Sequence, residues 1–223
     1  MNMSSASSMR LWQLISPTLP IGAYAYSQGQ EYAVEAGWVH DEASAVEWII
    51  GQLNNNLAHL DVPIFLRLYQ AWQAQDVAQV IARNNRLLAM RESAELRSED
   101  QHLAAALQKV LAGLDVDMPK LDCPALAFAT VFAFACRHWQ IDRIEAARGL
   151  LWSWCENQVA AAIKLIPLGQ TAGQRIMSCA MPVIAQSVQW AERLDDDDIG
   201  MSAPGLGIAS ARHETQYTRL FRS

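Results

Sequence analysis

The stretch from Gly149 to Ala191 reads GLLWSWCENQVAAAIKLIPLGQTAGQRIMSCAMPVIAQSVQWA, and its scarcity of charge decides how the chain folds. It contains only three charged residues, Glu156, Lys164 and Arg175. A helix that is apolar on every side must be buried on every side. We therefore expect this stretch to form the centre of the fold. Part of its surface is also expected to face a second copy of the chain, in a homodimer.

Outward from this stretch, apolar residues recur at helical spacing nearly throughout, as in the series Val46, Ile49, Ile50, Leu53 and Leu57. Helix starts are predicted at Asp41, at Asp61 with Pro63, and at two capping boxes, Asp142 with Glu145 and Thr171 with Gln174. Alternating strand patterns are absent from the sequence. The chain is therefore predicted to be all-α, a single-domain bundle of roughly eight to ten helices.

Composition excludes several classes of partner. The chain has 223 residues, of which 52% are hydrophobic and 18% charged, and its formal net charge is −6. Nucleic-acid-binding proteins usually carry a basic patch or stripe, which this acidic sequence lacks. The uncharged runs Cys123 to Cys136 and Ile176 to Ala191 are shorter than the roughly 20 apolar residues of a membrane span. We expect neither a nucleic-acid partner nor a membrane.

Cysteine usage indicates the compartment. The four cysteines are far apart and lie in apolar stretches: Cys123, Cys136, Cys155 and Cys179. This pattern is typical of buried thiols in a reducing compartment rather than of a disulfide framework. The sequence therefore predicts a reducing compartment.

Two stretches do not fit the helical pattern. Ser16 to Ala25 contains two prolines and a glycine, which indicates an ordered loop or a broken helix. Leu194 to Gly207 combines an aspartate run with glycine and proline, which is typical of a linker. The predicted organisation is a helical domain over residues 1–193, a flexible linker over 194–207 and a C-terminal partner-docking tail over 208–223.

The tail carries aromatic, leucine and arginine side chains in one short segment, as binding hot spots do. Its candidate partner-binding residues are Arg212, His213, Glu214, Gln216, Tyr217, Arg219, Leu220, Phe221 and Arg222. We expect this tail to be loosely ordered until a partner binds. The alternative is a C-terminal helix that packs on its own domain.

The segment from Pro17 to Glu31 is the second candidate for recognition. Its prolines fix the backbone, and Gly22 permits a tight bend. The candidate partner-binding residues are Tyr24, Tyr26, Ser27, Gln28 and Glu31, since rigid loops with tyrosine and amide side chains suit recognition. The alternative is a loop whose tyrosines fill the core.

Motifs for catalysis are mostly missing. The sequence has no phosphate-binding loop, no nucleophile elbow and no histidine pair at helical spacing, so we predict no enzyme activity and no cofactor. Whether the chain binds a metal stays open. Lys164, with Glu156 on the same helix, is the one candidate catalytic pair, although an ion-paired or snorkelling lysine explains it as well. A dimeric scaffold, or a small-molecule enzyme that uses Lys164, is the alternative function.

Four blocks of this sequence resemble the urease accessory protein family UreF. They are Leu14 to Gly29 with Ala33 to Val39, Arg91 to Arg97, Glu156 to Gln170, and Ile208 to Ser223. They follow the family's order and span most of the chain. The departures are few: Gln30 stands where the family often has Leu, and Thr218 where it often has Ser. The Cys123–Pro124 region lacks a histidine that many members have.

The resemblance implies a helper in the assembly of a nickel enzyme. Family members are all-α cytoplasmic dimers that bridge a UreD-type protein, called UreH in some bacteria, and the GTPase UreG. The resulting complex inserts nickel into apo-urease. The chain is thus expected to have four partners: a second copy, a UreD/UreH-type protein, a UreG-type GTPase, and apo-urease through the complex. The resemblance also favours a binding role over catalysis for the neighbourhood of Lys164.

Overall fold

The structure is a computed structural model, and it describes residues 5–201 and 203–223. The first four residues of the predicted helical domain lie outside the described part. The described residues form helices and no strand, which confirms the all-α prediction. The helices are α1 (Ser5–Leu14), α2 (Gln30–Glu35), α3 (Glu42–Gln52), α4 (Asp61–Ala74), α5 (Val77–Ala89), α6 (Ala94–Ala112), α7 (Phe128–His138), α8 (Arg143–Leu165), α9 (Gln170–Ala191) and α10 (Pro204–His213).

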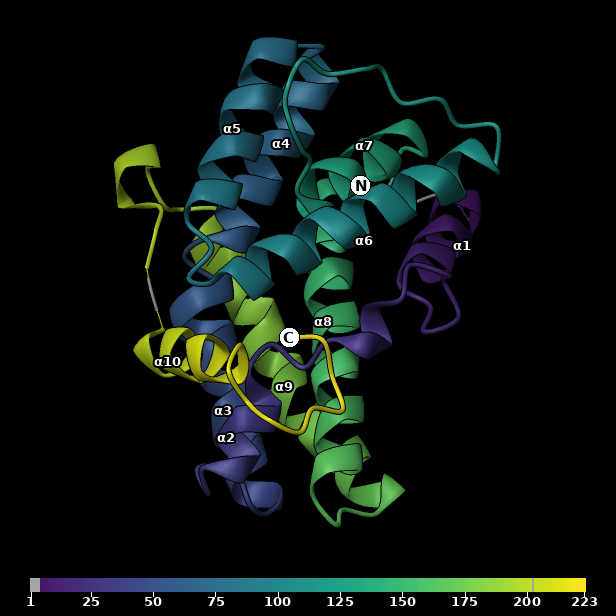
Figure 1. The fold of residues 1–223 in the computed structure, drawn as a ribbon. Helices are drawn as coiled ribbons and strands as arrows, with labels where there is room; N and C mark the ends of the chain where they lie inside the picture. The colour runs from purple at the N-terminus through teal and green to yellow at the C-terminus, as the bar shows by residue number, and fades with distance from the viewer. Residues whose placement is uncertain (1–4, 202) are drawn as a thin grey trace.

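Helices α8 and α9 lie side by side through the middle of the molecule, as their lack of charge predicts (Figure 1). The helix α4 packs against α5, α7 and α8, and ten of its fourteen residues are buried. A tilted aromatic pair, Phe65 and Phe132, joins α4 to α7 with ring centroids 5.9 Å apart. The apolar faces of these helices meet in one core, which the shorter helices α1, α2 and α10 border.

Local capping chemistry explains where several helices begin. The Asp41 side chain accepts a hydrogen bond from Ser44 N, and the Ser44 hydroxyl oxygen accepts one from the Asp41 amide. Helix α3 therefore starts with a full capping box. Asp142 accepts from the backbone of Ile144 and Glu145 at the start of α8. The predicted box at Thr171 is wrong. Helix α9 begins at Gln170 instead, where Gly169 is the N-cap and no side chain bonds to the helix end.

The connection between α9 and α10 differs from the predicted flexible linker 194–207. Asp196 pairs with Arg67 of α4 and Arg83 of α5, and the Arg86 guanidinium donates to the Ile199 carbonyl at 2.7 Å. The hydrogen bond from Arg67 is the largest reason why the pKa of Asp196 lies below its ordinary value. Helix α10 then begins at Pro204, inside the predicted linker, because proline is favoured in a first helical turn. Residues 194–200 are therefore held against the helical body, while residue 202 of the predicted linker lies outside the described residues.

All four cysteines are free, and two of them fit the prediction of buried thiols. Cys136 and Cys155 are buried, and burial raises the pKa of Cys155 to about 12. Cys123 is half-buried, and Cys179 is exposed on α9, so the prediction is wrong for Cys179. Throughout residues 5–201 and 203–223, every helix is too short or too polar for a membrane span.

Candidate partner-binding site

The two predicted recognition segments lie far apart in sequence but meet in the structure. In Figure 1 the C-terminal segment, in yellow, runs beside the loop that precedes α2. The Ser27 amide and hydroxyl both donate to the Ser223 carbonyl, at 2.7 and 2.6 Å. The Arg222 amide donates to the Ala25 carbonyl at 2.8 Å. The loop thus forms the surface on which the tail lies.

Gly29 allows the loop before α2 to approach α10 closely. Gly29 has a φ of +75°, and a Cβ at this position would lie 2.8 Å from the backbone nitrogen of Ser210. Its neighbour Gln28 also adopts a left-handed backbone, with φ 53°. The hydroxyls of Ser93 and Ser210 lie 2.6 Å apart and connect α10 to the start of α6. The loop therefore packs backbone to backbone against α10, and a side-chain hydrogen bond joins α10 to the start of α6.

A buried carboxylate fixes the end of the tail. Glu31, on α2, accepts hydrogen bonds from the backbone amides of Leu220 and Phe221, at 2.6 and 2.9 Å. The same carboxylate lies 3.1 Å from Nε2 of His213. Hydrogen bonds to an ionised group are about twice as strong as neutral ones. Glu31 is thus the residue that joins α2, α10 and the tail.

His213 is fully buried between two carboxylates. Its Nδ1 lies 2.7 Å from Glu95 of α6, while its Nε2 faces Glu31. Both ring nitrogens thus lie within hydrogen-bonding distance of a carboxylate. Arg219 places a positive charge at the other oxygen of Glu95. We call the set Glu31, Glu95, His213 and Arg219 the charge clasp. It holds the tail, in contrast to the loose order expected from the sequence.

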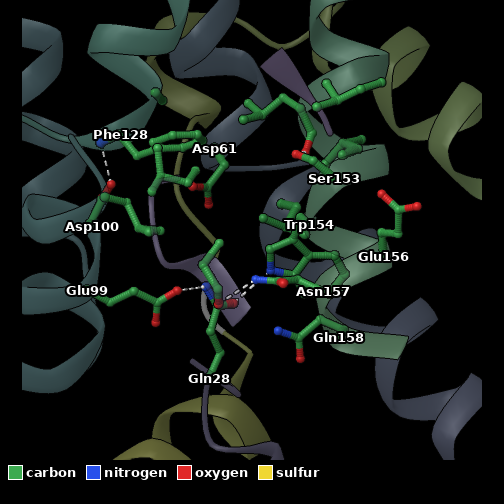
Figure 2. A pocket seen from close by; sticks show the side chains of 18 of the residues that line it. Gln28, Asp61, Glu99, Asp100, Phe128, Ser153, Trp154, Glu156, Asn157 and Gln158 are labelled. Atoms are coloured by element: carbon green, nitrogen blue, oxygen red, sulfur yellow. Dashed lines mark hydrogen bonds between the residues drawn. The ribbon is translucent and has the colours of Figure 1, made fainter. Parts of the chain in front are cut away.

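The inner end of the loop reaches a cavity of about 260 Å³ between α6 and α8 (Figure 2). Gln28 lies between the two helices. Its amide nitrogen donates to Glu99 of α6 at 2.8 Å, and its carbonyl accepts from the Trp154 indole of α8 at 2.7 Å. The Ser223 hydroxyl lies 2.6 Å from the other oxygen of Glu99. Burial raises the pKa of Glu99 to about 7.

A buried ion network borders the same cavity. Arg91 bonds to Asp61 at 2.7 Å and to Asp100 at 2.8 Å. Burial acts to lower the pKa of Arg91, but the charges of Asp100 and Asp61 raise it well above its ordinary value. Three buried amides that line the cavity have an atom without a hydrogen-bond partner among the described residues: Gln52, Asn56 and Gln158. Buried polar groups of this kind are usually satisfied by water.

The sequence analysis did not single out these cavity residues. Gln52 and Asn56 stand one helical turn apart, and Gln158 falls within a block quoted for the family resemblance. The sequence signal that could have pointed to these residues is an amide side chain at a buried position of a helix. The described residues contain no cluster of three or more His, Cys, Asp or Glu side chains that could hold a metal.

The structure divides the predicted partner-binding residues into two groups. Those that face inward are Tyr26, Ser27, Glu31, His213 and Phe221, which are buried, and Gln28 and Gln216, which are half-buried. The Tyr26 hydroxyl, for example, lies 3.3 Å from His102. In the free chain these residues have little surface to offer a partner. They support the site from within.

The second group faces solvent and consists of Tyr24, Arg212, Glu214, Tyr217, Arg219, Leu220 and Arg222. The Tyr217 side chain is fully exposed, and Tyr24 and Leu220 are 68% and 65% exposed. Glu214 also accepts from the backbone amides of Ala94 and Glu95 at the start of α6. We call Tyr24, Tyr217 and Leu220 the exposed anchors.

Lys164 does not have the environment of a catalytic lysine. Its side chain is exposed, and its Nζ lies 5.6 Å from the centre of the Phe221 ring. This cation–π contact adds to the attachment of the tail. Glu156, the suggested partner, lines the cavity instead, where burial raises its pKa.

Comparison with known proteins gives a consistent result. The sequence profile of the UreF family matches residues 39–181. The urease accessory protein UreF of Alkalilimnicola ehrlichii is 49% identical over 216 residues, which cover 96% of this chain and 95% of that protein. The UreF proteins of Hahella chejuensis and Teredinibacter turnerae are 46% and 45% identical; each match covers 96% of this chain, and 97% and 98% of the relative. This chain belongs to the UreF family of urease accessory proteins, and it is an accessory protein rather than an enzyme.

Proposed function

We propose that this chain helps to activate apo-urease by bridging a UreD/UreH-type protein and a UreG-type GTPase, in the complex that inserts nickel. Nickel is the cargo of that complex, and the chain acts in the cytoplasm as a homodimer. Membership of the urease accessory family supports the proposal. The partner-binding face consists of the tail together with the loop on which it lies.

The observation that carries the proposal is a rigid tail with exposed anchors. Tyr217 and Leu220 point to solvent, although His213 and Phe221 in the same segment are buried. Glu31 of α2 holds the tail backbone by accepting hydrogen bonds from the amides of Leu220 and Phe221. Aromatic and apolar side chains held in a fixed conformation bind at a lower entropy cost than a mobile tail would. We assign the UreD/UreH-type protein to this surface.

The homodimer is assigned to the charge-poor surface of α9. Met181 and Trp190 of this helix are 48% and 51% exposed, and Cys179 is exposed as well. Large apolar side chains left exposed on a charge-poor helix are typical of an interface between subunits. Trp190 also contacts the ring of His59, with centroids 5.8 Å apart, so its orientation is fixed.

The test of bridging is a three-component capture experiment. A tagged UreG-type GTPase is mixed with the UreD/UreH-type protein, with and without this chain. We expect the UreD/UreH-type protein to be retained only when this chain is present. Equal retention in its absence would contradict bridging. Truncation after Ser210 is a poor variant for this experiment because it also removes the buried His213 and Phe221.

A further inference from the structure

The cavity between α6 and α8 is lined by many more acidic side chains than basic ones. Among the described residues that form its walls, Arg91 is the one basic residue, and it is already bonded to Asp61 and Asp100. Three further carboxyl residues of the lining have no ion-pair partner in the described part of the chain: Glu92, Glu99 and Glu156. The cavity therefore holds negative charge that its own lining does not balance.

Burial of these three carboxyl groups is costly. In each of them, burial is the largest cause of a raised pKa. An opposite charge within about 4–6 Å favours the ionised form of a carboxyl group. A cation in the cavity would therefore offset part of the cost of burying them.

The cavity also contains buried hydrogen-bond acceptors without a donor. Oε1 of Gln158 and Oδ1 of Asn56 have no partner among the residues that the structure describes, and the two residues are 1% and 3% exposed. Oε2 of Glu92 is a third open acceptor, whereas Nε2 of Gln52 is the one open donor of the described lining. Figure 2 shows the Gln158 amide extending from α8 toward Gln28. Water can satisfy such atoms, but it brings no positive charge to the carboxyl groups.

The backbone at Asn56 supports a binding role. Asn56 lies in a π-helical turn, Leu53–Leu57, and Gln52 directly precedes this turn. Turns of this kind are rare and frequently occur at functional sites. Two of the open polar atoms thus belong to an irregular part of the backbone.

The shape of the cavity limits what it can hold. A cavity of about 150 Å³ holds benzene, so the volume of about 260 Å³ has room for roughly ten non-hydrogen atoms. Pro17, Tyr24 and Ala160 belong to the lining and are exposed, so the cavity opens at the surface. Its apolar walls include Leu14, Ile15, Leu19, Leu103, Leu150 and Leu151. A fitting occupant is thus small, partly aliphatic and able to enter from solvent.

A single metal ion does not match this arrangement. The described residues contain no cluster of His, Cys, Asp or Glu side chains that could hold one. Glu99 of α6 and Glu156 of α8 lie on opposite sides of the cavity instead (Figure 2). Ammonium groups donate up to three hydrogen bonds and accept none. Several of them, joined by methylene segments, can reach separate carboxyl groups.

We propose that this cavity binds a linear aliphatic polyamine of about the size of spermidine. Its ammonium groups bond to the unpaired carboxyl groups and to the open acceptors of Gln158 and Asn56, and its methylene segments lie against the leucine and isoleucine side chains. The rings of Tyr24 and Trp154 also line the cavity, and such rings attract ammonium groups. The open donor of Gln52 keeps a water molecule as its partner. This inference does not rest on the function proposed above.

The test is isothermal titration calorimetry of the full chain with spermidine at about 0.15 M salt, where exposed charges more than about 8 Å apart are largely screened. Glu92→Gln removes one charge of the cavity and keeps the shape of the side chain, and Gln158→Met removes one open acceptor. The matched control is Glu47→Gln, the same change at an exposed position of α3 outside the cavity. Magnesium chloride serves as a compact divalent cation, and fully acetylated spermidine as an uncharged analogue.

We expect one spermidine to bind per wild-type chain. The affinity should fall about tenfold in Glu92→Gln, the value of about one hydrogen bond to a charged group, and about threefold or more in Gln158→Met. It should stay unchanged in Glu47→Gln. No binding at millimolar spermidine would overturn the site, as would equal losses in Glu92→Gln and Glu47→Gln. Displacement by an equal concentration of magnesium, or equal binding of the acetylated analogue, would overturn the assignment to a polyamine.

If the cavity variants fail to fold, NMR of the wild-type chain decides. The side-chain amide signals of Asn56 and Gln158 should shift as spermidine is added, whereas those of Gln13 and Gln174, which are exposed and lie outside the cavity, should not. Shifts confined to exposed amides would overturn the proposal.

Discussion

Replacing Glu31 with alanine should release the tail while the helical body stays folded. The carboxylate accepts from two tail amides at 2.6 and 2.9 Å and faces Nε2 of His213 at 3.1 Å. A buried donor left without its acceptor costs about 1–3 kcal/mol, so the two tail amides together should cost about 2–6 kcal/mol. Since about 1.4 kcal/mol corresponds to tenfold, tail docking should weaken by about thirtyfold or more. The apolar core packs without Glu31, so most of this cost should appear as local opening.

Amide hydrogen exchange measures this opening residue by residue. The Leu220 and Phe221 amides should lose most of their protection in Glu31→Ala, whereas amides in the middle of α8 should keep theirs. Glu35→Ala is the control, since Glu35 lies one turn further along α2 and is exposed. Unchanged protection of the two tail amides would refute the reasoning. Complete unfolding of the variant would show that the tail belongs to the core.

Two further predictions concern stability and assembly. Arg91→Met leaves Asp61 and Asp100 buried without their cation, so it should lower the free energy of unfolding by about 3–5 kcal/mol in urea denaturation; an unchanged midpoint would contradict this. In sedimentation at micromolar concentration, the wild-type chain should have about twice its mass of 24.8 kDa, and Trp190→Glu should shift it toward the monomer. A strictly monomeric wild type would rule out the dimer.

Helix positions could be predicted from the sequence because their signals are local. Asp41 and Asp142 cap the helices that follow them, and Asp61 lies in the first turn of α4, as predicted. The box at Thr171 was wrong because a capping residue must precede the first turn, and the helix had already begun at Gln170. A spacing of three residues alone does not identify which residue begins the helix.

The arrangement of the site could not be predicted because it depends on tertiary contacts. Both segments could be singled out by their residue types, but nothing in those residue types shows that Glu31 bonds to the backbone of Leu220. The flexible linker was inferred from glycine and aspartate. Its actual fixation comes from Arg67 and Arg83, more than a hundred residues earlier in the chain. Partner residues so distant in sequence leave no local pattern.

The same limit applies to the roles of individual side chains. Tyr26 and Tyr24 stand two residues apart in one loop, yet the first is buried and the second exposed. The core-filling alternative is therefore right for Tyr26, and Tyr24 remains a candidate for contact. His213, predicted as a contact residue, is instead buried between Glu31 and Glu95.

The affinity of the purified UreD/UreH-type protein for a variant that carries Tyr217→Ala and Leu220→Ala tests the central claim most directly. Both side chains are exposed and lie outside the charge clasp, so the variant should keep the thermal stability of the wild type. A hot-spot anchor contributes about 2 kcal/mol or more, and such contributions are not additive, so we predict a loss of affinity from about thirtyfold, the value for one anchor, to about several hundredfold, the value for two. The control is Val77→Ala, an exposed apolar position at the start of α5. Wild-type affinity in a folded double variant would contradict the account.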